Sequence, residues 1–484
     1  MSCPLAAGSN RASSVPAAAR LIPLERLWPG VLLAICALVG LLAGVEPKFA
    51  IAAAVGLAFI LLIFSNFAAG LALFAFLSFL ELLQLGSAVS VGKVGGGVVV
   101  LAWIATIATR DKKEEFIEAH PAITMLIGAF LGWIALGITW SESNSEVLSA
   151  LTRYIPNALL ILIVFTAVKS RKQALMIIAG IVLGALAASV YGILHASNEE
   201  ARLQGTALDP NELASLLVAS AALSAAFAAN MKGRPHLRLL AGIVTGLCVL
   251  GVFLTVSRGG LIALAASLLA AILFAGRWRP LALGATVLIA AAGFYYFAVL
   301  APPEATERLQ LTSEGETALR EGRTTIWQVA ERIVEAKPLT GVGAGNFQTS
   351  ARQYLLQPGA LGRTDLIIAT PKVVHNTYLG IAAELGLVGL SLFVALILFS
   401  VGSAIQAARH FTALGDRGGE ALARGLTVAL AGILVADFFI SQEYSKQLWL
   451  LLGLGPALLA TARAERAKGI SGPAAGQAAV PSLR

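Results

Sequence analysis

The sequence predicts an all-α fold, a polytopic transmembrane helical bundle, and two observations carry that prediction. The 484-residue chain is 57% hydrophobic and only 13% charged, with a mean hydropathy of +0.81, whereas soluble domains have about 25% charged residues. Apolar runs of about 16–25 residues recur along the chain, enough to cross a hydrocarbon core of about 30 Å as helices. The runs do not alternate between polar and apolar residues, which disfavours a β-barrel.

The apolar runs define the expected spans, in a bundle of about 12–14 helices. They fall at residues 30–45, 49–65, 67–85, 94–109, 121–140, 154–168, 174–195, 212–230, 239–256, 260–275, 281–301, 377–402, 425–441 and 447–461. Lys and Arg decide the orientation, because they concentrate in cytoplasmic segments. With the N-terminus cytoplasmic, inside segments hold 21 of the 35 Lys and Arg, and short outside loops hold six. We therefore expect both termini in the cytoplasm.

The same counting divides the chain into regions. We expect a cytoplasmic tail at 1–29, N-terminal transmembrane helices at 30–301, a large extracytoplasmic loop at 302–376, C-terminal transmembrane helices at 377–461 and a second cytoplasmic tail at 462–484. The net charge of +8 follows from cytoplasmic anchoring, so no nucleic-acid partner is implied.

The large loop contains a predicted amphipathic helix at 324–337 on the outer face of the membrane. Its apolar residues recur at helical spacing, at Ile326, Val329, Ala330, Ile333 and Val334. Thr325 and Gln328 form a candidate capping box, which puts Arg323 at the N-terminal edge, and Pro338 ends the helix. The following glycines, at 341, 343 and 345, indicate either a turn or a phosphate cradle. The turn is favoured because no strand precedes them.

Arg258 is the strongest candidate for chemistry, since the motif SRGG at 257–260 places a cation between two apolar spans. Ionisable groups in such places often serve function, and a guanidinium forks onto phosphate oxygens. The alternative is an interfacial anchor whose charge reaches toward the headgroups.

His375 directly precedes an apolar span, where an imidazole can accept a proton from a hydroxyl near neutral pH. The alternative is a histidine at a helix cap, and His195 is the competing candidate at another outer helix end. Arg323 is a third candidate. No histidine or carboxylate spacing typical of a metal site accompanies them, so we expect neither metal nor cofactor.

Five further polar residues near outer helix ends are candidate substrate-binding residues: Arg202, Asn211, Asn376, Asp437 and Lys446. Asp437 falls within an expected span, where a carboxylate is costly. The Asp209–Pro210–Asn211 sequence has a competing explanation as a turn and helix cap.

Four motifs follow one another between Arg202 and Leu390, and their order and spacing are informative: RLQGTALDPNELA, SRGG, GRTTIWQVAERIVEAKPLTGVGAGNF and HNTYLGIAAELGLVGL. Together they resemble the bacterial O-antigen ligase and O-antigen polymerase family. The resemblance implies a GT-C-like glycosyltransferase in the cytoplasmic membrane, which builds cell-envelope polysaccharides such as lipopolysaccharide. Its donor is a glycan on undecaprenyl diphosphate, and a glycan or glycolipid accepts it at the outer face without metal or ATP.

The resemblance also implies residue roles. It assigns Arg258 to the family's SRGG-like arginine, Arg323 to the loop arginine, His375 to the histidine before the next helix, and Asp437 to a late acidic residue. These roles imply a single displacement at the anomeric carbon of the donor sugar, which inverts the configuration of that carbon. Three alternatives stay open: a polymerase of O-antigen, capsule or exopolysaccharide in place of a ligase, a transporter or flippase, and a non-catalytic assembly scaffold.

Overall fold

The computed structural model describes residues 40, 44, 47–79, 91–109, 120–195, 202–204, 209–231, 233–310, 314–357 and 373–471. These residues form helices and their connections, and none of the described residues lies in a strand. The all-α prediction is therefore confirmed. The chain divides into two compact units, Met1–Ala58 and Phe59–Arg484, and all of the candidate site residues belong to the second.

The helices follow the expected spans closely. They are α2 Pro47–Ser65, α3 Phe67–Leu77, α4 Val91–Ala108, α6 Pro121–Leu136, α7 Asn144–Ala167, α8 Arg171–Leu194, α9 Pro210–Asn230, α10 Pro235–Leu254, α11 Arg258–Phe274, α12 Arg279–Tyr295, α13 Pro303–Gln310, α14 Glu314–Ala336, α15 Phe347–Leu355, α17 Thr377–Ala413, α18 Arg417–Ala436 and α19 Lys446–Ser471, with short turns η2 Gly137–Thr139, η3 Gly276–Trp278 and η4 Tyr296–Leu300.

Within the described residues, nine helices are long and apolar enough to cross a membrane, and four shorter apolar helices accompany them. A helix therefore occurs at every expected span except 30–45, which lies outside the described residues apart from 40 and 44. Several details differ from the prediction. The helix α3 ends at Leu77, α7 begins early enough to include Arg153 rather than leave it in a connection, and α17 breaks at Gly386 and continues past 402 to Ala413. The helix α19 runs past 461 to Ser471, into the region 462–484 that is expected as a tail.

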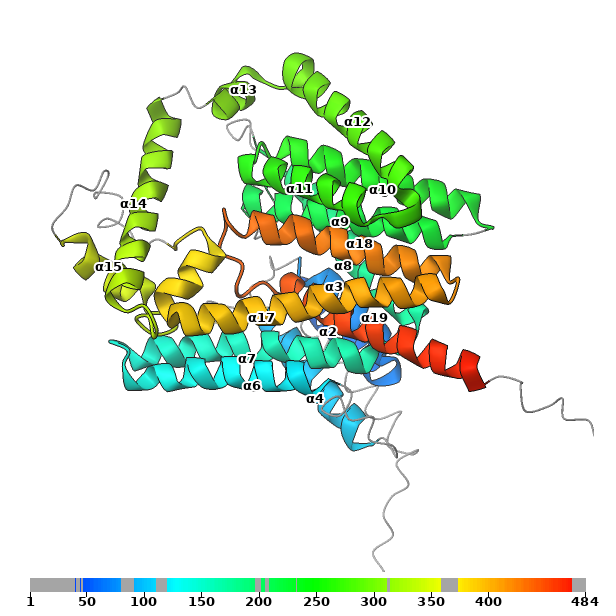
Figure 1. The fold of residues 1–484 in the computed structure, drawn as a ribbon, viewed down its shortest axis with the longest axis horizontal. Coiled ribbons are helices and arrows are strands. Elements are labelled where there is room, and N and C mark those ends of the chain that lie inside the picture. Colours follow the sequence, from blue (N-terminus) through cyan, green and yellow to red (C-terminus); the bar gives the residue numbers. More distant parts are fainter. Residues whose placement is uncertain are drawn as a thin grey trace, which may run out of the picture. The chain divides into compact units, whose positions relative to one another are not determined.

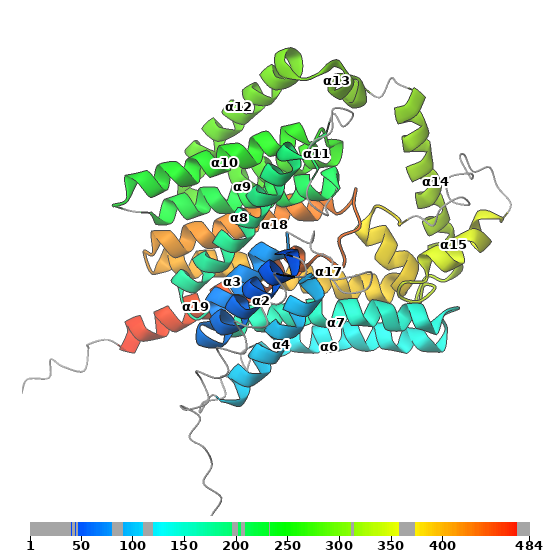
Figure 2. The same cartoon turned by 180° about the vertical axis from the view of Figure 1, so that it is seen from behind.

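The helix α9 lies in the middle of one group of helices and packs against α8, α10, α11 and α18 (Figure 1). The helix α17 joins this group to the rest, because it packs against α6, α18 and α19. Seen from behind, α6 and α7 run side by side (Figure 2). These packed helices supply two ends at which polar side chains gather.

One end is held together by ion pairs and is called the basic end here. Glu420 is 1% exposed and accepts a hydrogen bond from Arg424 Nε at 3.0 Å. It also forms an ion pair with Arg277, whose Nε lies 3.1 Å from Oε2. Arg171 pairs with Asp416 at 2.6 Å. These contacts join the start of α18 to the end of α11 and the start of α8. The candidate site residues lie at the opposite ends of these helices, called the site end.

Helix starts at the site end are capped by side chains. Asp209 accepts from the amides of Asn211 and Glu212 at the start of α9, which confirms the predicted helix cap. Ser257 and Asn376 cap α11 and α17 in the same way. Such caps matter because the first amides of a helix have no partner within it.

The segment between α12 and α17 has a hydrophobic core of its own. The predicted apolar face is confirmed, since Ile326, Val329, Ala330 and Ile333 are buried, and α14 packs on α15 and α17 (Figure 1). The predicted start of this helix is wrong. Because α14 begins at Glu314, Arg323 and Thr325 lie inside it, and Thr325 does not begin a capping box.

Candidate active site

Arg258 is the first residue of α11, and the turn before it is unusual. Val256 has φ of +49°, a left-handed conformation that is an outlier for a β-branched residue. Ser257 then caps the helix by accepting from Gly260 N at 3.0 Å, while its hydroxyl donates to Asn211 Oδ1 at 2.7 Å. The turn thus fixes where Arg258 leaves the backbone.

The two glycines of SRGG allow α11 to approach its neighbours closely. A Cβ at Gly260 would lie 2.5 Å from Cβ of Ala214 on α9, and one at Gly259 would lie 2.9 Å from Cβ of Phe439. Neither separation is tolerated between real carbon atoms. The motif therefore needs glycine at both positions to hold the start of α11 close to α9 and to the connection 437–445.

Arg202 and Asn211 lie beside this turn. Arg202 Nε donates to Thr255 O at 2.9 Å, and its second nitrogen donates to Asn211 Oδ1 at 3.3 Å. The oxygen of Asn211 thereby accepts from both Arg202 and Ser257. The structure brings these two candidates to the α11 start, and it gives both of them a role in holding the turn.

His375 stands immediately before α17 in a left-handed conformation, with φ of +54°. This conformation costs about 1–2 kcal/mol for a residue with a side chain, and such outliers gather at functional sites. The amide of His375 donates to Ser441 Oγ at 3.1 Å. Asn376 follows it and caps α17 by accepting from Leu379 N at 3.0 Å, so its oxygen is engaged within the protein.

The connection 437–445 between α18 and α19 touches both halves of the site. Thr377 N donates to Asp437 O at 2.8 Å and to Ile440 O at 2.9 Å, next to His375. Gln442 Nε2 donates to Ser215 Oγ on α9 at 3.0 Å. The same short segment therefore contacts the start of α17 and the group around α9 and α11.

Arg323 approaches the same region from α14. Trp327, one turn further along this helix, donates from Nε1 to Val374 O at 3.0 Å. Residues four apart lie on the same helix face, so Arg323 belongs to the turn next to the His375 segment.

Asp437 and Lys446 mark the two ends of the connection. Asp437 is 0% exposed, and neither of its carboxylate oxygens has a hydrogen-bond partner among the described residues. Lys446 is the first residue of α19. Glu443 lies between these two residues in the chain, and its burial is the main cause that raises its pKa to about 7.

The glycine turn does form an anion cradle, and a carboxylate of the chain itself fills it. Glu384 accepts from Gly345 N at 2.8 Å and from Phe347 N at 3.3 Å. Gly341, Gly343 and Gly345 all have positive φ. The turn interpretation is thus confirmed for the role of the glycines, and Glu384 is a residue that sequence reasoning missed. The sequence feature that points to Glu384 is a carboxylate within an apolar run.

His195, the competing histidine, ends α8 and stacks on Tyr191 of the same helix with ring centroids 3.9 Å apart.

No group of three or more His, Cys, Asp or Glu that suits a metal ion occurs within the described residues.

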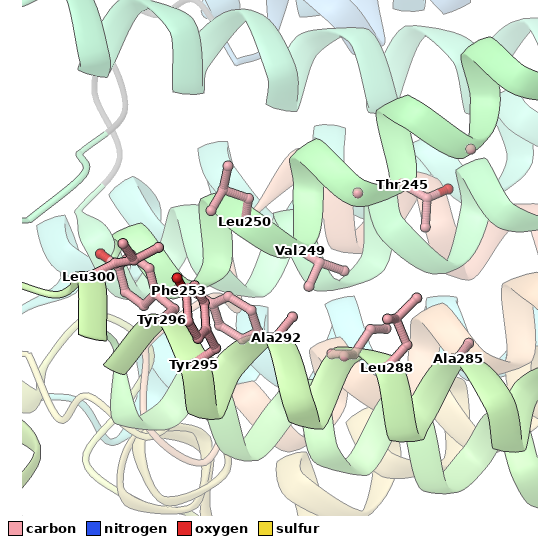
Figure 3. Close-up of a pocket in the computed structure, with 13 residues that line it drawn as sticks. Thr245, Val249, Leu250, Phe253, Ala285, Leu288, Ala292, Tyr295, Tyr296 and Leu300 are labelled. Atoms are coloured by element: carbon pink, nitrogen blue, oxygen red, sulfur yellow. The ribbon is translucent and has the colours of Figure 1, made fainter. Parts of the chain in front are cut away.

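An apolar groove between α10 and α12 leads toward the site end. It has a volume of about 490 Å³. Figure 3 shows Val249 of α10 pointing toward α12, where Leu288 and Ala292 lie. Phe253, five residues before Arg258, lines the groove, so one end of the groove lies near the SRGG turn.

The packed apolar helices define a polytopic membrane protein, and the candidate active site lies at the site end of these helices. Residues 243–394 match a family model described as O-antigen ligase. The match confirms the resemblance and supports the O-antigen ligase and polymerase family. The match supports a membrane glycosyltransferase of the O-antigen ligase and polymerase type, a family that implies lipid-linked glycan substrates.

The matched region runs from α10 into α17 and contains Arg258, Arg323, His375 and Asn376. The other candidates lie outside it: Arg202, Asn211, Asp437 and Lys446. No curated protein matches the chain.

Proposed function

We propose that the protein transfers a glycan from undecaprenyl diphosphate to a hydroxyl of a lipid or glycan acceptor, at the outer face of the bacterial cytoplasmic membrane. One observation carries the proposal. The connection 437–445 is hydrogen-bonded to the start of α17 beside His375 and packs against the start of α11 beside Arg258. A histidine and an arginine held by one segment suit a reaction between a hydroxyl and a diphosphate.

The chemistry assigns a role to each catalytic candidate. The acceptor oxygen attacks the anomeric carbon, the bond from that carbon to the diphosphate oxygen breaks, and undecaprenyl diphosphate leaves. Arg258 and Arg323 stabilise the negative charge that develops on the leaving group. His375 takes the proton of the acceptor hydroxyl. A single displacement inverts the configuration. It requires no ATP because the diphosphate linkage supplies the energy, and no metal because the two arginines stabilise the leaving group.

The substrate-binding candidates divide between the two halves of the site. Arg202 and Asn211 adjoin Arg258 on the donor side, and Asn376 adjoins His375 on the acceptor side. Asp437 and Lys446 bracket the connection that lies between. The apolar groove of Figure 3 supports a place for the polyprenyl chain, because it runs along α10 to within five residues of Arg258.

Ligase and polymerase differ in the acceptor, and the residues above serve both reactions. A polymerase of the same family therefore stays the alternative, separated by whether the product is a glycolipid of one length or a growing polysaccharide. A transporter or flippase is less supported, since such proteins bind at the bilayer midplane, whereas these candidates lie at helix ends.

The test is transfer by purified protein in lipid vesicles, with a labelled lipid-linked glycan, EDTA present and ATP absent. We expect transfer, with Arg258→Lys reduced by about 10² or more, because a point charge does not replace a bidentate fork. The matched control is Arg279→Lys, which changes an exposed arginine at the basic end and should retain the wild-type rate. Loss of transfer in EDTA with recovery on adding a divalent ion contradicts the metal-free mechanism. Full activity of Arg258→Lys reduces this arginine to an anchor.

A further inference from the structure

The connection 437–445 makes several hydrogen bonds to the start of α17. Ser441 Oγ accepts the amide of His375 at 3.1 Å. Thr377 Oγ1 donates to Ile440 O at 2.8 Å and accepts from Gln442 N at 2.9 Å. Three consecutive residues of the connection thus bind the two ends of the tripeptide His375–Thr377.

The same connection contacts the other half of the site through two side chains. Gln442 Nε2 donates to Ser215 Oγ at 3.0 Å, and both residues are buried. Phe439 fills the space that Gly259 leaves open. Arg258 adjoins Gly259, so the contacts of Ser441, Gln442 and Phe439 connect the His375 backbone to the start of α11.

The conformation of His375 makes the Ser441 contact specific. A left-handed residue other than glycine persists only when its surroundings hold it there. The Ser441 hydroxyl binds the backbone amide of His375 itself, and Asn376 and Thr377 fix the residues that follow. Without the hydroxyl, His375 is free to return toward negative φ, and its imidazole then points elsewhere.

We propose that Ser441 and Gln442 are positioning residues, which hold the imidazole of His375 at a fixed distance and direction from the guanidinium of Arg258. This inference rests on the proposed function, since it assigns the two side chains to that reaction. Neither residue needs to touch substrate. Ser441 sets the backbone of His375, and Gln442 anchors the connection to α9.

The experiment compares Ser441→Ala, Ser441→Thr and Gln442→Leu with wild type in the vesicle assay. We expect kcat to fall by about 10- to 100-fold for the alanine and leucine variants, as for a displaced catalytic group. KM for the lipid-linked donor should stay within about twofold, because Arg258 remains. Threonine keeps the hydroxyl and should restore most of kcat. Ser391→Ala, which removes an exposed hydroxyl bonded to Leu387 O of its own helix, is the matched control and should behave as wild type.

A second readout separates this inference from the proposed function. Amide hydrogen exchange of a peptide covering 373–379 should speed up by about two- to tenfold in Ser441→Ala, as expected for one lost hydrogen bond, and not in Ser391→Ala. Faster exchange in a protein that transfers no glycan supports the positioning contact and contradicts the proposed function. Glycan transfer with unchanged exchange and unchanged kcat in Ser441→Ala overturns the positioning role.

Discussion

Replacing Gly260 by alanine should disable the site through packing alone. The added Cβ would lie 2.5 Å from Cβ of Ala214 and 3.2 Å from Cβ of Ser257. Non-bonded carbon atoms prefer about 3.5–4.0 Å, so α11 and α9 must separate by about 1 Å. Both neighbours are backbone-proximal carbons that cannot rotate away.

Two opposing effects set the size of the loss. Overpacking of this kind costs about 1–3 kcal/mol, while alanine in place of glycine within a helix gains about 0.5–1 kcal/mol. The net destabilisation is therefore about 0–2.5 kcal/mol, smaller than the effect on activity. A shift of about 1 Å at the start of α11 carries Arg258 with it, and such misplacement lowers rates by about 10².

Gly284→Ala in α12 is the matched control, because no atom lies within 4 Å of the Cβ it would add. The assay pairs the thermal unfolding midpoint with the glycan transfer rate of the same membrane preparation. We expect a lower midpoint and a much lower rate for Gly260→Ala, and a midpoint at or above wild type for Gly284→Ala. A Gly260→Ala protein with the wild-type rate and midpoint refutes the close-approach argument for SRGG.

Three further predictions concern the histidine, the orientation and the buried acid. His375→Ala should lower transfer by about 10²–10⁴ at normal membrane levels, and His375→Gln should be as poor if the imidazole moves a proton. Exposed His236→Ala is the control and should keep the wild-type rate. Wild-type rates in both His375 variants reject His375 as the base. In a variant without native cysteines, a cysteine placed at exposed Gln348 should react with a membrane-impermeant reagent in intact cells. Protection of that cysteine rejects the outer placement of 302–376. The pKa of Glu443 is raised to about 7 from an ordinary 4.5, so the folded protein binds this proton more tightly than the unfolded chain. Stability is therefore lost as pH rises from about 4.5 through about 7. Glu443→Gln should weaken this decline over the same pH window, and an unchanged decline contradicts the assignment.

The sequence predicted the parts of the site that break a local pattern. Arg258 stood out because its neighbours are apolar, and the buried face of α14 followed from the spacing of Ile326, Val329 and Ile333. Helix existence was predictable for the same reason, since long apolar runs have few alternatives to a helix.

Long-range pairings were not predictable. Ser441 and Gln442 look like ordinary polar residues of a short connection, and their partners lie 66 and 227 residues away. The start of α14 was missed because Thr325 and Gln328 imitate a capping box, whereas polar residues from Glu314 onward continue the helix. Arg153 was assigned to a connection because the apolar run begins after it, although α7 already starts at Asn144.

The pairing of Glu384 with the glycine turn has a consequence for the thermodynamics of binding. Ordering a flexible loop around an anionic ligand consumes conformational entropy at the moment of binding. Here an internal carboxylate orders residues 341–347 when the protein folds, and the break at Gly386 lets α17 accommodate the turn against Leu339. The turn is therefore ordered by folding itself, and a ligand that contacted it would not have to supply the free energy of ordering it.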